Sequence, residues 1–210
     1  MPGSTAAGVW PRPIELGLRL VSAYALLIWL ARGYGRICVD ALMPTFRTMI
    51  WSLDDHARVL SLAIVNDGAD TVIRMTVELI QDVTINGQLF AAKGYTYSSS
   101  IGTGLILQPV IVAFGLVLAW PVRRVIEYPV RIAVTIAILS LVLVADTPLT
   151  LWANYLHTIV APESFSLLWL WEEFLVNGGR LALGLVTAVV AIKMAGYVAE
   201  QTIPDTKVSS

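Results

Sequence analysis

Asp146 and Arg180 are the two residues whose types and positions most directly suggest chemistry. Asp146 lies inside one long apolar run, and Arg180 begins another. An ionisable residue at membrane depth is costly, so it is a candidate for function together with a partner of opposite charge. We predict that the two lie at the same outer level of consecutive helices, as a candidate intramembrane pair. Such a pair either fixes helix packing or takes part in chemistry, and the packing role is the more common one.

Other reactive side chains fall on the predicted outer side, namely Cys38, His56 and His157. A membrane thiol transpeptidase would need a thiolate, a base and a cation such as Arg180 there. No glycine-rich elbow or paired motif surrounds Cys38, and a lone cysteine at a helix end usually acts as a small hydrophobic residue. We therefore assign no catalytic residue. A proton or ion relay would need more intramembrane carboxylates or histidines than this chain has.

Metal and cofactor chemistry finds little support in the sequence. The run SLDDH, with His56 beside two aspartates, lacks the second ligand cluster that a metal site requires, and paired aspartates more often form turns. One cysteine excludes an intramolecular disulfide and a multi-cysteine cluster. No phosphate-binding glycine loop is present. We predict no cofactor, and the net charge of −1 argues against a nucleic-acid partner.

The composition indicates the elements that must position these residues. Hydrophobic residues make up 57% of the 210 residues and charged residues only 14%, with a mean hydropathy of +0.73. Soluble domains of this size rarely have such a composition, so a multi-pass membrane protein in contact with the lipid bilayer is the expectation.

An arginine-rich loop sets the predicted topology. The segment PVRRVIEYPVR carries Arg123, Arg124 and Arg131 between the apolar runs Gly104–Trp120 and Ile132–Trp152. Each run is about long enough to cross a hydrocarbon core of roughly 30 Å. Short arginine-rich loops lie on the cytoplasmic side, so both chain termini are predicted to be cytoplasmic.

The first apolar helix is the weakest point of this topology. It places Arg32 and Arg36 on the outer flank, where they either snorkel to the headgroups or pair with Asp40. No convincing cleavage site follows, so we interpret the helix as an uncleaved anchor. The alternative is an interfacial helix that never crosses. An amphipathic elbow on the outer leaflet, broken by Pro44, is predicted next.

A small antiparallel β subdomain is predicted between the first two membrane helices. Residues 71–80 alternate apolar and polar side chains with the two-residue period of a half-buried strand. Asn86-Gly87 between short β-prone segments is a hairpin signal. About 45 residues cannot bury a self-sufficient core, so the apolar face should pack on the chain's own helices or on a partner. A Tyr/Ser-rich stretch then leads back to the bilayer.

The outer loop after the third helix has no lysine or arginine and contains SLLWLWEEF, which is typical of a helix lying in the membrane interface. Tryptophans near the ends of the predicted spans are expected to anchor them at headgroup depth: Trp51, Trp120, Trp152, Trp169 and Trp171.

The expected fold is an α-helical membrane protein with four transmembrane helices and the β subdomain inserted between helices 1 and 2. The parts in order are a cytoplasmic lead (1–14), helix 1 (15–33), the outer elbow and β subdomain (34–101), helix 2 (102–121), the arginine loop (122–131), helix 3 (132–152), the outer loop (153–179), helix 4 (180–198) and a cytoplasmic tail (199–210).

This layout, with Pro44 and Trp51 in the elbow and LILQPVIVAFGLVLAWP in the second helix, resembles the small accessory membrane proteins encoded beside exosortases, in particular those of the exosortase H type. The resemblance covers about residues 15–197. It implies a non-catalytic partner, in the bacterial inner membrane, of a transpeptidase-like enzyme that processes proteins carrying a C-terminal sorting signal. No catalytic residue is carried over.

Two functions from different classes follow. The first is a non-catalytic accessory subunit that docks its β subdomain and outer loops onto a larger envelope enzyme, or onto a respiratory or secretion complex. The second is a small membrane enzyme or transporter that works at the outer ends of its helices with Asp146, Arg180 and His157.

Overall fold

The computed structural model describes residues 13–52, 57–68, 70–85, 88–122, 124–160 and 167–201. Helices dominate these residues, and the strands form one group after the first helix. The helices are α1 (Pro13–Trp51), α2 (Thr103–Ala119), α3 (Glu127–Tyr155), the π-helix η1 (Leu156–Val160), α4 (Leu167–Phe174), the π-helix η2 (Leu175–Gly179) and α5 (Arg180–Gln201). The strands are β1 (Ala57–Asp67), β2 (Asp70–Leu79), β3 (Val83–Ile85), β4 (Gln88–Ala91) and β5 (Thr96–Gly102).

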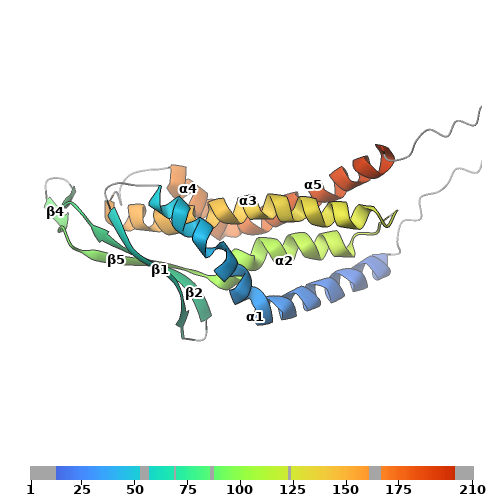
Figure 1. Cartoon of the computed structure of the whole chain (residues 1–210), viewed down its shortest axis with the longest axis horizontal. Coiled ribbons are helices and arrows are strands. Elements are labelled where there is room, and N and C mark those ends of the chain that lie inside the picture. The colour runs from blue at the N-terminus through green and yellow to red at the C-terminus, as the bar shows by residue number, and fades with distance from the viewer. Residues whose placement is uncertain are drawn as a thin grey trace, which may run out of the picture.

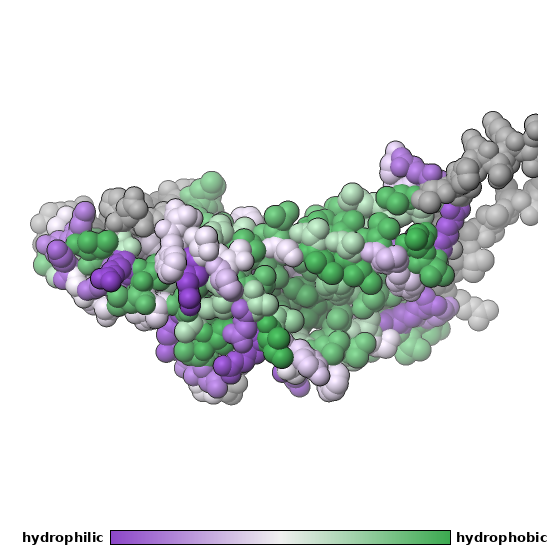
Figure 2. All heavy atoms as spheres, in the orientation of Figure 1, coloured by the Kyte–Doolittle hydropathy of each residue, from purple (hydrophilic) through white to green (hydrophobic). Residues whose placement is uncertain are grey.

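The molecule is elongated, with the helices along its long axis and the strands at one end (Figure 1). The start of α1, the α2–α3 connection and the end of α5 lie together at the opposite end. Hydrophobic residues cover most of the visible surface of the helices, whereas hydrophilic residues gather at that opposite end and over the strands (Figure 2). This distribution fits a molecule whose helices cross an apolar layer between two aqueous regions.

Three helical segments within the described residues are long and apolar enough to cross a membrane: Pro13–Trp51, Glu127–Ile159 and Leu167–Gln201. The remaining one of the four predicted spans is helix 2. It corresponds to α2, which has 17 residues and falls below that length. At 1.5 Å per residue it is about 26 Å long. It is short because the residues before it pair as β5 and the residues after it form the connection to α3.

The predicted break at Pro44 is wrong, because α1 is one continuous helix of 39 residues. Its C-terminal half packs against the sheet. Val39, Phe46 and Ile50 are fully or almost fully buried, in the same core as the sheet. A proline removes one backbone donor from a helix. Here the packing of Phe46 and Ile50 against the sheet holds the turns after Pro44 in place.

A three-stranded antiparallel sheet forms in the order β1-β2-β5. In β2 the residues Ile73, Met75, Val77 and Leu79 are buried while those between them are partly exposed, which confirms the predicted alternation. The Tyr/Ser-rich stretch forms β5, the third strand of this sheet, and Tyr97 pairs opposite Val77. The strand ends at Gly102, directly before α2, so the stretch leads into the second predicted membrane helix as expected.

A second, two-stranded sheet joins β3 and β4, as the hairpin signal predicted. The register shifts by one residue between Val83 and Thr84, so Phe90 on β4 has no partner opposite it. The predicted turn residues Asn86-Gly87 lie outside the described residues. β4 occupies the extreme end of the molecule (Figure 1).

The sheet and the helices share one hydrophobic core. The inner face of β2 packs with side chains from α1, α2 and α3, including Phe46, Ile106, Trp152 and Tyr155. Tyr97 of β5 also contacts η1, where its hydroxyl donates to Thr158 Oγ1 at 3.2 Å. Of the two predicted coverings for the apolar face of the sheet, the chain's own helices are therefore present.

Several predicted boundaries shift. α3 begins at Glu127, so the predicted arginine loop (122–131) is half helical. At its other end the helix continues through η1 into the predicted outer loop (153–179), which also contains α4, close to the expected interfacial helix. α5 runs from Arg180 to Gln201 and includes the first residues of the predicted tail. The lead up to residue 12 and residues 202–210 lie outside the described part of the chain.

Candidate functional site

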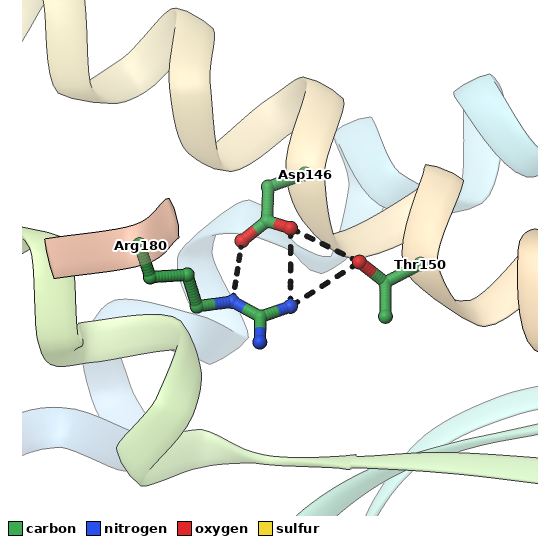
Figure 3. Close-up of polar contacts among 3 residues, drawn as sticks. All are labelled: Asp146, Thr150 and Arg180. Atoms are coloured by element: carbon green, nitrogen blue, oxygen red, sulfur yellow. Dashed lines mark hydrogen bonds and ion pairs between the residues drawn. The ribbon is translucent and has the colours of Figure 1, made fainter. Parts of the chain in front are cut away.

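Asp146 and Arg180 are in direct contact. Arg180 Nε donates to Asp146 Oδ2 at 2.9 Å, and Arg180 Nη2 donates to Asp146 Oδ1 at 3.1 Å, so the guanidinium binds the carboxylate through two parallel hydrogen bonds (Figure 3). Charge-assisted pairs of this fork geometry are the strongest class of protein hydrogen bond. The sequence predicted that the two residues would be near each other, and the structure adds the bidentate geometry.

Thr150 completes the group and was not predicted. Its hydroxyl accepts from Arg180 Nη2 at 3.2 Å and donates to Asp146 Oδ1 at 3.0 Å. Asp146 and Thr150 are four residues apart on α3 and therefore share one face of the helix. That spacing is visible in the sequence, but so are many threonines in apolar helices, and only the approach of Arg180 distinguishes this one.

Arg180 reaches α3 because of the connection that precedes it. It is the first residue of α5, and Gly178, two residues earlier, has a φ of +103°. Glycine adopts this left-handed conformation without the steric cost of a side chain. Asn177 supports the bend by donating its Nδ2 to Glu173 O at 2.9 Å. The chain thus turns sharply between α4 and α5 and directs Arg180 into the helix bundle.

The pair is closed to solvent. The side chains of Arg180 and Asp146 are 2% and 0% exposed, and Thr150 is also buried. Removing two charges from water is expensive, and the two groups repay that cost only through good mutual geometry and further hydrogen bonds. Such bonds are present here. The arrangement links α3 to α5 and leaves no exposed face of either charged group for a substrate to contact.

His157 does not join this pair in the structure. It is exposed in η1, and its ring lies 6.0 Å, centroid to centroid, from the indole of Trp169 on α4. Glu172 of α4 is partly buried and interacts electrostatically with both His157 and Arg180. Glu172 therefore lies between His157 and Arg180 in its electrostatic interactions. The sequence analysis had grouped His157 with Arg180 but had not included Glu172.

The other reactive residues named in the sequence analysis are not placed at this site by the structure. Cys38 is exposed on α1. His56 and the aspartates of SLDDH lie outside the described residues. Within the described ranges no group of three or more His, Cys, Asp or Glu side chains is placed to hold a metal ion.

A second buried ion pair lies at the other end of the bundle. Arg131 Nη2 binds Glu127 Oε2 at 2.7 Å, and both side chains are almost fully buried. Arg131 also donates to the carbonyl oxygens of Trp120 and Pro121, at 2.9 and 3.2 Å, and so satisfies acceptors at the C-terminal end of α2. The Glu127–Arg131 spacing of four residues was a signal for this pair that the sequence analysis did not use.

The three arginines predicted to determine topology therefore have different surroundings. The charge of Arg131 is balanced by Glu127, whereas Arg124 donates to Ala199 O at 2.7 Å and holds the end of α5. Arg123 lies outside the described residues.

The five predicted interface tryptophans differ in their exposure to solvent. Trp51 and Trp120 are exposed, and Trp169 and Trp171 are partly buried on α4. Trp152 is a correction, because it is buried and its ring lies 4.9 Å from that of Tyr155. An indole enclosed in the protein core cannot contact lipid headgroups.

Comparisons with known proteins give no further guide. No family model, curated protein or solved structure matches this chain.

Proposed function

We propose that the chain is a multi-pass membrane protein, with α1, α2, α3 and α5 as four spanning helices and with both termini in the cytoplasm. The bare apolar surface of the helices supports this. None of the most apolar window of α1 is buried inside the protein, and large side chains such as Leu18 and Leu141 are 70% and 74% exposed. Lipid is the environment in which such surfaces are stable.

The arrangement of the connections supports the same proposal. The α2–α3 connection with Arg124 lies at the same end as the start of α1 and the end of α5, as a cytoplasmic assignment of all three requires (Figure 1). The short α2 packs against α1 and α5, both of which are longer. In a bacterial cell this membrane would be the inner membrane, with the sheets in the periplasm.

Within that membrane we propose a non-catalytic accessory subunit of a larger envelope enzyme or assembly. The observation that carries this is strand β4 of the β3–β4 hairpin, in which Leu89 and Phe90 are 61% and 53% exposed. β4 is at the extreme end of the long axis, so lipid around the helices cannot cover these side chains (Figure 1). A protein partner is the covering that remains.

The inner face of the sheet is not the docking surface in this proposal, because the chain's own helices already cover it. The closed Asp146–Arg180 pair is consistent with a structural rather than a catalytic role for the bundle. An exosortase-type transpeptidase is the first partner to test, on the basis of the layout of the helices and the β subdomain.

The test is affinity purification of the full chain from native membranes in mild detergent, with a double variant Leu89→Ser/Phe90→Ser. The proposal expects a stoichiometric larger membrane protein with the natural chain and at least a tenfold lower recovery with the variant, since burial of two such side chains contributes about 1.5–3 kcal/mol each. The control is Val125→Ser/Ile126→Ser, which alters two exposed apolar residues at the opposite end. Recovery of the natural chain alone, monodisperse, would refute the accessory role.

A small membrane enzyme or transporter is the second candidate, favoured by the electrostatic grouping of His157, Glu172 and Arg180 at the outer end of the bundle. His157→Ala and Glu172→Gln separate the two. Loss of the cellular function at normal protein levels would favour chemistry, whereas unchanged function would exclude a role for this group.

A further inference from the structure

Arg32 differs from the other arginines of α1 in its surroundings. Arg19 pairs with Glu15 at 2.6 Å, Arg36 with Asp40 at 3.9 Å, and Arg47 donates to the carbonyl oxygen of Leu62. Within the described residues, Arg32 has no such anionic or carbonyl partner. A free guanidinium on an otherwise apolar helix is a site for an anion from outside the chain.

The position of Arg32 along α1 indicates where that anion must be. Residues 20–31 contain no charged side chain, and Arg32 is the first charge after them. Exposed apolar side chains cover this stretch up to Leu30. The hydrocarbon layer that the proposed insertion requires must therefore end near Arg32, which places the guanidinium at the depth of the lipid headgroups.

The surface around Arg32 is slightly hollowed. Trp29, Arg32, Gly33 and Tyr34, all from α1, line a shallow hollow that is largely open to the surroundings. Trp29, Arg32 and Gly33 are three and four residues apart and share a face of the helix. A Cβ added at Gly33 would meet no atom within 4 Å, so there is open space beside Arg32 on this face of the helix. Exposed tryptophan and tyrosine are the side chains enriched at headgroup depth.

We propose that this hollow binds the phosphate of a membrane phospholipid, with Arg32 as the phosphate ligand and with Trp29 and Tyr34 against the glycerol and upper acyl region. A guanidinium donates two parallel hydrogen bonds to a phosphate, which a hydrated ammonium cannot do as well. Arginine and lysine are usually enriched on the cytoplasmic side of a membrane protein. A bound phosphate would explain how Arg32 is tolerated on the outer flank of α1. This inference rests on the proposed insertion of α1 in a membrane.

The test measures phospholipid retained by the full-length protein. The chain is extracted in mild detergent, mixed with phosphatidylglycerol, or with diacylglycerol carrying the same acyl chains, and analysed by native mass spectrometry. The natural chain is expected to retain phosphatidylglycerol at least tenfold more tightly than diacylglycerol, because charge-assisted hydrogen bonds to the phosphate are lost in the latter.

Two variants change the site in different ways. Arg32→Gln removes the charge and is expected to lower phosphatidylglycerol affinity about tenfold. Gly33→Leu fills the hollow, where there is space for the side chain, and favours the helix, so it should lower lipid retention without loss of stability. Arg36→Gln is the matched control one turn away and should bind lipid as the natural chain does.

Equal retention by the natural chain, Arg32→Gln and Gly33→Leu would overturn the lipid site, as would an equal loss in Arg36→Gln. Displacement of the lipid by millimolar inorganic phosphate alone would also overturn it, because the site would then take a free anion. Carbonate extraction of the natural chain from membranes is measured in parallel. Release by carbonate would refute membrane insertion itself, whereas retention in the membrane with no bound lipid would refute only this site.

Discussion

Gly115 of α2 lies directly against the ring of Tyr24 of α1. A Cβ at Gly115 would come within 2.8 Å of Cε1 and Cζ of that ring, closer than carbon atoms approach in proteins. The Tyr24 hydroxyl also reaches Val112 O at 3.4 Å. The N-terminal half of α1 therefore packs on α2 at a point where only glycine fits, since small residues let two helices approach closely.

Gly115→Ala is expected to destabilise the protein by about 1–2 kcal/mol, because overpacking exceeds the gain in helix propensity. Unfolding of the detergent-solubilised chain would measure this. Gly104→Ala on the same helix is the control, since a Cβ there meets nothing within 4 Å. In a Tyr24→Ala background the effect of Gly115→Ala should disappear, and a persistent loss would show that the clash lies elsewhere.

The Asp146–Arg180 pair should behave as a structural unit. Asp146→Ala or Arg180→Ala alone leaves a buried unpaired charge and is expected to cost about 3–5 kcal/mol of unfolding free energy. The double variant Asp146→Leu/Arg180→Met should cost clearly less than the sum of the two. Thr150→Val removes one neutral partner and should cost about 1 kcal/mol. Additive effects of the two charge variants would contradict coupling between them.

Burial predicts a large difference between two ion pairs with the same N–O distance of 2.7 Å, Glu127–Arg131 and Asp67–Arg74. Arg131→Met leaves the buried Glu127 carboxylate and two carbonyl groups without their hydrogen-bond donor. It should lower the free energy of unfolding by about 3–5 kcal/mol. Arg74→Met affects a pair exposed to solvent and should cost about 0–1 kcal/mol. Raising the salt concentration should reduce only the second effect. Similar costs for both would argue that Arg131 is accessible to solvent.

Cys38 gives a direct measure of topology, because it is exposed and is the sole cysteine of the sequence. A membrane-impermeant maleimide should modify Cys38 in intact spheroplasts. In a Cys38→Ser/Val125→Cys chain, the exposed position 125 should react only after permeabilisation. Protection of both cysteines in intact spheroplasts would mean that α2, which lies between the two positions, does not cross the membrane. The reverse pattern would mean an inverted protein.

Local sequence periodicity was enough to predict much of the architecture. The alternation of apolar and polar residues along β2 and the β3–β4 hairpin depend on residues within a few positions of one another, so both were visible in the chain. The apolar runs likewise predicted α2 and α5 to within a few residues, because length and composition determine whether a helix can be stable in lipid.

Long-range packing decided the rest. Pro44 signals a break, yet α1 continues because Phe46 and Ile50 bury against a sheet that forms later in the chain. The serines of β5 have no strong strand preference, and their pairing with β2 makes them a strand. From the sequence, Trp152 was predicted to be an interface anchor. In the structure it is buried and packs against Tyr155.

The candidate site shows the same division. The sequence indicated Asp146 and Arg180 individually, because charges are rare in apolar runs and need partners of opposite sign. The bend at Gly178, the approach of α5 to α3 and the hydroxyl of Thr150 determine that the two form a closed bidentate pair. The contacts of Arg180 with Asp146 and Thr150 join residues 30 or more positions apart, and no local pattern encodes the free energy of those contacts.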